Sequence, residues 1–136
     1  MKITNQELIS LAKDARKYAY APYSDFFVGA ALLCSDGTVY TGCNIENASF
    51  TPTCCAERVA IFKAVSDGEQ DFLAIAVSGG KHGEKSADKF VPCGVCRQVM
   101  REFCGDDFRI ILDCDGGEAV YTLGELLPES FGKEKL

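Results

Sequence analysis

The sequence has no apolar run approaching the roughly 20 residues that a membrane-spanning helix needs, so no transmembrane segment is expected. Its first residues, MKITNQELISLAKDARKYAY, lack the uninterrupted apolar stretch of a secretory signal. A cytoplasmic protein that does not insert into membranes is therefore predicted. Histidine is almost absent as well, and the one present, His82, lies in a polar segment without a partner motif. We expect it to be an exposed loop residue.

An excess of positive charge is also missing. Lysine and arginine number 14 against 20 acidic residues, and the formal net charge is −6. Polyanion binding depends on clustered basic side chains that neutralise phosphates. The densest basic stretch, KHGEKSADK at 81–89, has acidic residues among its lysines. Nucleic acid is therefore not expected as a partner, and a small molecule is.

The chain has 136 residues and is 47% apolar, which suits one packed domain spanning residues 1–136. No linker, internal repeat or low-complexity tract interrupts it. Without a secretory signal, its eight cysteines are predicted to bind metal, act in catalysis or pack as buried thiols. Four stand singly in apolar surroundings and are assigned to the core: Cys34, Cys43, Cys104 and Cys114.

Local patterns predict alternating helices and strands. Thr4 and Glu7 form a capping box that opens a helix to about Tyr20. The remaining elements are a hairpin of 26–34 and 39–45, helices at 55–66 and 94–103, strands at 72–78, 108–114 and 118–121, and a short helix after Thr122. Segment 79–91 is polar and has no periodicity. Strand–helix–strand units between 39 and 114 predict a layered α/β fold with a partly parallel sheet.

Two stretches, TPTCCAERVAIF at 51–62 and PCGVC at 92–96, carry the chemistry. Cys93 and Cys96 alone could be half of a zinc site or a redox dithiol. Both this pair and Cys55 open predicted helices, where the positive helix end favours the thiolate that a metal needs. Three thiolates with one open position are typical of catalytic zinc. Cys54 should point away from its neighbour and is expected to be a packed thiol.

Glu57 and Arg58 lie two and three residues after the proposed ligand Cys55. A glutamate beside a water activated by zinc can take its proton and pass it to a leaving group. The alternative is a solvated acid in the first turn of a helix. Three thiolates and Zn²⁺ sum to a charge of −1, and Arg58 could offset it by donating hydrogen bonds to sulfur. Its alternative is a surface ion pair.

These motifs resemble the cytidine deaminase superfamily, whose signature includes a three-cysteine variant and a non-ligand glutamate. The likeness to the small, homotetrameric cytidine deaminases covers nearly the whole chain: YAPYSDFFVGAALL (20–33), GCNIENASF (42–50), CAERVAIFKAVSDG (55–68), PCGVCRQVMREF (92–103) and ELLPESF (125–131). The resemblance implies the following roles: zinc ligands Cys55, Cys93 and Cys96; proton shuttle Glu57; ribose 3′-hydroxyl contacts Asn44 and Glu46; pyrimidine contacts Phe26 and Ala56; and Phe131 lent by a neighbouring subunit.

The same resemblance implies a layered α/β/α fold with a five-stranded mixed sheet. It also implies hydrolytic deamination of free cytidine and 2′-deoxycytidine in pyrimidine salvage. Three alternatives remain open: a deaminase of a cytosine-nucleoside antibiotic of the blasticidin S type, a binding protein with purely structural zinc, and a dithiol redox module. Two departures from the family pattern are Phe50, where tyrosine is frequent, and Val91, where serine is common.

Overall fold

The computed structural model describes residues 2–81, 90–114 and 117–136. Within these ranges the elements are α1 (Asn5–Ala15), a 3-10 turn η1 (Arg16–Tyr18), β1 (Phe26–Cys34), β2 (Val39–Cys43), α2 (Ala56–Ser66), β3 (Phe72–Lys81), α3 (Gly94–Phe103), β4 (Arg109–Cys114), β5 (Gly117–Thr122), α4 (Leu123–Leu126) and a 3-10 turn η2 (Lys133–Lys135). None of the helices in the described ranges has the length and apolar character required to span a membrane.

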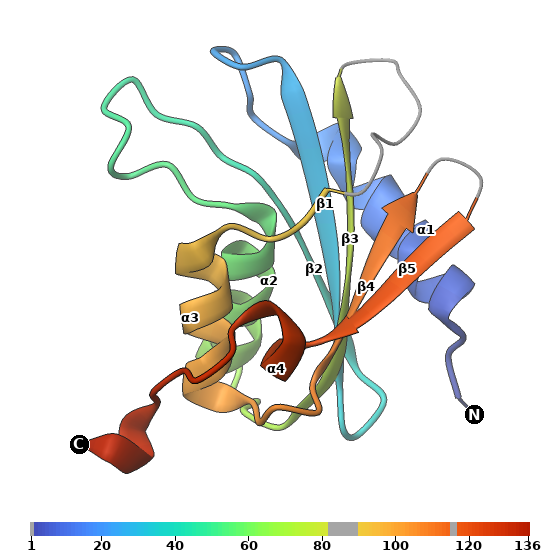
Figure 1. The fold of residues 1–136 in the computed structure, drawn as a ribbon. Helices are drawn as coiled ribbons and strands as arrows, with labels where there is room; N and C mark the ends of the chain where they lie inside the picture. The colour runs from blue at the N-terminus through green and yellow to red at the C-terminus, as the bar shows by residue number, and fades with distance from the viewer. Residues whose placement is uncertain (1, 82–89, 115–116) are drawn as a thin grey trace.

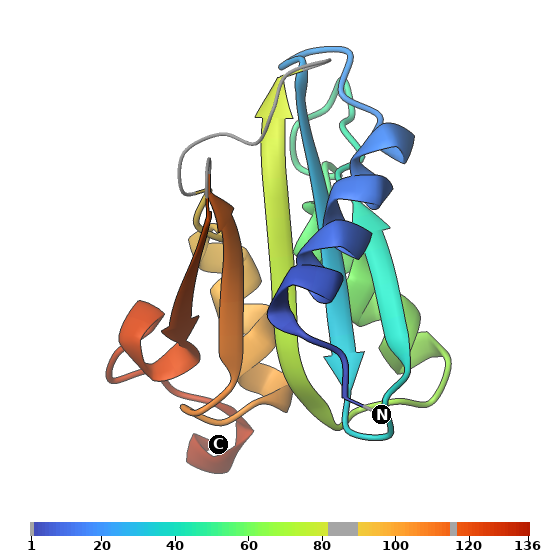
Figure 2. The ribbon, with the colours of Figure 1, turned by 90° about the vertical axis from the view of Figure 1, so that its right-hand side faces the viewer.

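The strands form one five-stranded sheet in the order β2-β1-β3-β4-β5. Only β3 and β4 pair in parallel, and the other neighbours are antiparallel. Helix α1 covers one face, while α2 and α3 cover the other, as Figures 1 and 2 show from two directions. The predicted α/β/α layering with a mixed five-stranded sheet is confirmed.

Side-chain alternation along β1 separates two hydrophobic cores. Ala31 and Leu33 pack with α1 on one face, and Ala30 and Leu32 join the larger core on the face of α2 and α3. Gly29 lets α1 approach closely, since a Cβ there would lie 1.9 Å from the carbonyl oxygen of Ala12. Helix α1 therefore rests directly on the backbone of β1.

The same packing places several chain segments at one end of the sheet, the upper end in Figure 1. Strand β1 begins there and β3 ends there, paired through Phe26 and Lys81. Helices α2 and α3 both begin about midway along the sheet and run away from this end (Figure 1). Residues from β1, from the start of α2 and from the segment that leads into α3 line one cavity.

Some predictions about individual elements were wrong. Helix α1 ends at Ala15 and continues only as η1, because Tyr20 already donates its backbone N–H to the carbonyl of Asn44. Strand β3 extends to Lys81, where a polar loop was predicted. Cys34 and Cys104 are buried as predicted, but Cys43 and Cys114 are only half-buried. His82 lies outside the described residues.

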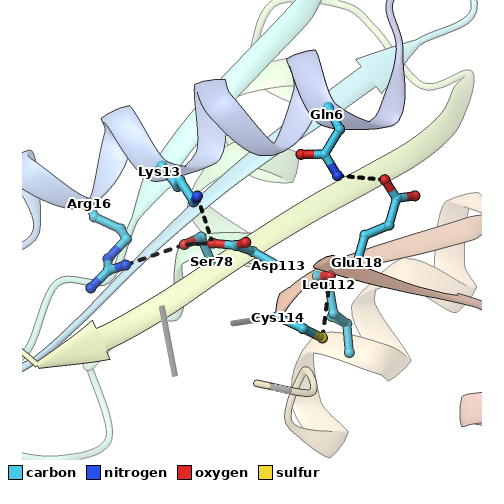
Figure 3. A network of polar contacts seen from close by, with 8 residues as sticks. All are labelled: Gln6, Lys13, Arg16, Ser78, Leu112, Asp113, Cys114 and Glu118. Carbon is cyan, nitrogen blue, oxygen red and sulfur yellow. Dashed lines mark hydrogen bonds and ion pairs between the residues drawn. The ribbon is translucent and has the colours of Figure 1, made fainter. Parts of the chain in front are cut away.

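A polar network is enclosed between α1 and the sheet (Figure 3). Ser78 of β3 donates its hydroxyl to Oδ2 of Asp113 on β4 at 2.8 Å, and both residues are buried. Arg16 Nη1 lies 3.4 Å from the Ser78 hydroxyl, and Lys13 Nζ lies 3.7 Å from the Asp113 carboxylate. Further along the helix, Gln6 donates to Glu118 at 2.7 Å. Polar contacts thus anchor α1 to β3, β4 and β5.

Replacing Asp113 with alanine should lower the free energy of unfolding by about 2–3 kcal/mol, because it leaves buried donors without their acceptor. Asp14 of α1 provides a matched control, since its carboxylate is exposed and pairs with Lys17 of η1 at 2.9 Å. Asp14→Ala should lower the free energy of unfolding by less than about 0.5 kcal/mol. Urea unfolding followed by circular dichroism measures both. Equal midpoints for the two variants would show that the network adds no stability.

Candidate active site

Three cysteine sulfurs meet where α2 and α3 begin. Cys55 and Cys93 are the N-cap residues of the two helices, and Cys96 lies buried in the first turn of α3. The sulfurs of Cys55 and Cys93 are 3.8 Å apart, those of Cys93 and Cys96 are 3.4 Å apart, and all three lie within 4.8 Å of one another. The two helix starts therefore converge as the sequence predicted.

This cluster fits zinc. Ligands about 2.3 Å from a tetrahedral zinc ion are separated by about 3.8 Å, close to the sulfur spacings here. Among the described residues, no fourth histidine, cysteine or carboxylate joins the group. Cys54 stays outside it although it is next in sequence to Cys55. The geometry is that of a site with three protein ligands and an open position.

Arg58 sits beside the sulfurs. Its Nη2 lies 3.4 Å from the sulfur of Cys55 and 3.5 Å from the carbonyl oxygen of Thr53. The pKa of Cys55 is lowered, because the Cys96 thiol and the Arg58 guanidinium donate hydrogen bonds to its thiolate. The same hydrogen bond to Cys55 raises the pKa of Cys96. The cluster thus holds negative charge at Cys55, next to a fixed cation, and Arg58 is not a surface residue.

Glu57, in the first turn of α2, is 1% exposed, so the alternative of a solvated acid does not apply. Its Oε1 has no hydrogen-bond partner among the described residues. Burial raises the pKa of Glu57 to about 7, and the charge of Cys55 adds to the effect. A buried carboxyl that is free to accept a hydrogen bond and titrates near neutrality has the properties of a general acid–base group.

A cavity of about 260 Å³ opens beside the cluster. This is near the lower end of small-molecule sites, which span about 300–1,000 Å³. Its lining combines metal-binding sulfurs, one buried carboxyl, polar groups and an apolar surface: Ser24, Phe26, Val28, Asn44, Glu46, Thr53, Cys54, Cys55, Ala56, Glu57, Phe90, Val91 and Cys93. The predicted residues Phe26, Asn44, Glu46 and Ala56 are all among them.

Hydrogen bonds within the chain orient the side chains of Asn44 and Glu46. The side-chain Oδ1 of Asn44 accepts from the N–H of Val28, and its Nδ2 donates to the carbonyl of Phe26, both at 2.9 Å. The side chain of Asn44 thus continues the hydrogen bonding to β1 beyond Cys43, where β2 ends. It retains a second amide N–H for a ligand.

Glu46 is held by the turn that precedes β1. Its Oε1 accepts from the backbone N–H groups of Tyr23 at 3.0 Å and Ser24 at 3.2 Å, while Oε2 accepts from the Ser24 hydroxyl. Although burial opposes the change, the hydrogen bonds to Ser24 and Tyr23 lower the pKa of Glu46 overall. The carboxylate stays ionised and has lone pairs left for a hydroxyl.

Phe131 does not lie in this cavity. Its side chain is 59% exposed, and its carbonyl accepts a hydrogen bond from Nε2 of Gln98 at 3.0 Å. The resemblance assigned it to a neighbouring subunit's site, and its position here leaves that assignment as a prediction.

Sequence reasoning missed several residues around the site. Arg97 donates from Nε to the carbonyl of Pro92 and from Nη1 to that of Leu126, both at 2.7 Å, and so fixes the segment that enters Cys93. The position of Arg97 directly after Cys96 was the sequence feature that could have indicated a role at the site. Phe90 was assigned to a polar loop, although an apolar pair before Pro92 could have indicated packing. Ser24 had no such signal, because its partner Glu46 lies 22 residues away.

Comparison with known proteins places this geometry in a family. Residues 2–112 match the family described as cytidine and deoxycytidylate deaminase zinc-binding region. A cytidine deaminase from Sporosarcina psychrophila is 50% identical over 132 residues, covering 96% of this chain and 93% of that protein. One from Halalkalibacterium halodurans is 48% identical, covering 96% of each chain.

Solved structures agree with the sequence relatives. The crystal structure of cytidine deaminase from Burkholderia pseudomallei superposes with a TM-score of 0.86 at 46% identity, covering 95% of this chain and all of that one. The enzyme from Mycobacterium tuberculosis gives a TM-score of 0.80 at 40% identity, covering 96% of this chain and 99% of that one. The chain therefore belongs to the zinc-binding cytidine and deoxycytidylate deaminase family.

Proposed function

We propose that this protein is a cytidine deaminase that converts free cytidine and 2′-deoxycytidine to uridine and 2′-deoxyuridine with release of ammonia, a step of pyrimidine salvage. The observation that carries the proposal is a cluster of three sulfurs beside one cavity, next to a buried carboxyl whose Oε1 has no partner among the described residues. A binding protein with structural zinc would need a fourth ligand and would have no use for Glu57.

In this proposal Cys55, Cys93 and Cys96 hold zinc, which when bound supplies a water acidic enough to give hydroxide near neutral pH. Glu57 accepts the proton of that water and delivers it to N3 of the pyrimidine. Hydroxide adds at C4, Glu57 accepts the remaining proton of the added hydroxyl and transfers it to the amino group, and the C4–N bond breaks to release ammonia and leave the C4 carbonyl. One water is consumed, and a C–N bond is exchanged for a C–O bond.

The remaining lining residues bind and orient the nucleoside. Phe26 packs against the pyrimidine, and the backbone at Ala56 contacts the base. Asn44 and Glu46 recognise the ribose 3′-hydroxyl through the donor and acceptor capacity that they retain. A half-buried polar pair that the chain holds in place disfavours ligands that leave it unpaired. It favours an unmodified sugar over a nucleoside antibiotic of the blasticidin S type.

We further propose that residues 1–136 form one domain, that the protein works in the cytoplasm and that it assembles as a homotetramer. Eight cysteines without a disulfide suit a reducing compartment. The exposed rings of Phe131 and Phe50 suit burial against neighbouring subunits. Light scattering should give a mass about four times the 14.7 kDa of the chain. A monomeric mass would contradict both the tetramer and the shared site.

Loss of the near-ultraviolet absorbance of cytidine on mixing with zinc-loaded protein tests the proposed activity. Cytidine and 2′-deoxycytidine should both react, and blasticidin S should not. Zinc should be present at about one ion per chain by elemental analysis. A zinc-loaded preparation that leaves cytidine intact would overturn the assignment, and reaction with blasticidin S alone would favour the antibiotic deaminase.

A further inference from the structure

Two aromatic rings form one side of the cavity. Phe26, at the start of β1, and Phe90, just before Pro92, have ring centroids 4.9 Å apart with planes tilted by 31°. Both line the cavity, together with Val28 and Val91. The centroid distance lies within the range that aromatic pairs prefer, so each ring packs against the other. We call Phe26 and Phe90 the aromatic wall.

Both rings of the aromatic wall pack against Gly79 of β3. This glycine is paired with Val28 across the β1–β3 ladder, so the missing side chain would project on the cavity face of the sheet. A Cβ at Gly79 would lie 3.0 Å from Cε2 of Phe26 and 3.1 Å from Cγ of Phe90. The glycine thus makes room for both rings at once.

Phe90 also links the wall to the metal cluster along the chain. It precedes Cys93 by three residues, and Cys93 lines the same cavity. The two rings are therefore built from segments on either side of the site. Phe26 begins β1, and Phe90 lies in the segment that leads into a cysteine of the cluster.

We propose that Phe90 is a positioning residue for the pyrimidine nucleoside. Seated on Gly79 and packed against Phe26, it completes an aromatic wall that holds the base flat within reach of Glu57. This rests on the proposed function. Planar bases gain affinity from aromatic faces, and removing one such face typically weakens binding about 5- to 150-fold. Because the wall contacts substrate and transition state alike, its loss raises KM more than it lowers kcat.

The test compares three wall variants with two controls in zinc-loaded protein. Phe90→Ala should raise KM for cytidine about tenfold and weaken uridine binding, measured by calorimetry, by a similar factor, with kcat within about threefold. Phe90→Leu should fall between this variant and the native protein. Gly79→Ala should raise KM several-fold, because its Cβ displaces both rings.

Phe103 supplies the matched aromatic control. Its ring packs against Phe72 at 5.9 Å, away from the cavity, so Phe103→Ala removes the same group from another pair and should leave KM and uridine affinity unchanged. Gly117→Ala controls for the glycine change, since no atom of the described residues lies within 4 Å of a Cβ there. If Phe90→Ala fails to fold, Phe90→Leu and Gly79→Ala carry the comparison.

Several outcomes would overturn the inference while leaving the deaminase assignment in place. One is an active native protein whose Phe90 and Gly79 variants match the controls in KM and uridine affinity. Another is loss of bound zinc in Phe90→Ala, which would make the residue a support for Cys93 alone. A zinc-loaded native protein that neither deaminates cytidine nor binds uridine would instead overturn the proposed function, and this inference with it.

Discussion

Glu57→Gln is expected to lower kcat for cytidine by about 10⁴-fold while leaving the zinc content at the native level. Glutamine has the same shape but its amide can neither accept nor deliver the proton. General acid–base groups typically contribute about 10²–10⁴-fold. Glu57 is assigned to both the transfer to N3 and the transfer to the leaving amine, so the upper end applies. Its oxygen does not contact the sulfurs, and metal binding should therefore persist.

The control for this change is Glu7→Gln. Glu7 also occupies the first turn of a helix, but it is exposed and closes a capping box with Thr4, a role that glutamine can fill. Stopped-flow or steady-state absorbance measures both variants, and elemental analysis measures their zinc. A zinc-loaded Glu57→Gln protein with kcat within tenfold of native would remove Glu57 from the proton transfers. Loss of zinc in this variant would make the residue structural.

The chemistry of the site was predictable because its decisive residues are local in sequence. Cys55 and Glu57 share one helix start, Cys93 and Cys96 share another, and helix starts favour thiolate by simple electrostatics. Two such helices on the same face of a sheet need only begin at the same end to bring the sulfurs together. The structure meets that condition.

The contacts that orient Asn44 and Glu46 were not predictable in the same way. Their partners, Val28 and Ser24, lie 16 and 22 residues away, and the pairing depends on how the turn before β1 folds back on β2. The end of α1 has a similar cause. The helical spacing of apolar residues continues past Ala15 in the sequence. The backbone of Tyr20, however, pairs with the segment around Ile45. Tertiary pairing overrides local propensity at both places.

Gly79 shows how a local signal can mislead. A Gly-Gly pair after an apolar run suggests a turn, yet both glycines lie inside β3 and pair with Phe27 and Val28 of β1. One of them is needed because two aromatic rings occupy the space above it. The requirement comes from Phe26 and Phe90, and no window of sequence contains all three residues.

Cys55→Ser is expected to weaken zinc binding about 10³-fold and to abolish deamination, whereas Cys54→Ser should retain about one zinc per chain. The two thiols are adjacent in sequence, but only Cys55 belongs to the sulfur cluster. Structural zinc sites bind with about 10–16 kcal/mol, and losing one of three ligands removes roughly a third of that. Zinc retained after dialysis against a graded chelator series measures the affinity.

The same two variants distinguish a zinc site from a redox dithiol. A dithiol formed by Cys93 and Cys96 would be indifferent to Cys55→Ser and would carry no metal. Equal zinc loss in both variants would instead make Cys54 a fourth ligand and close the open position that the reaction requires. Cys54 lines the cavity, but its sulfur lies outside the cluster of the other three. We therefore expect Cys55→Ser to lose zinc and Cys54→Ser to keep it. That result would identify Cys55 as the zinc ligand of the adjacent pair.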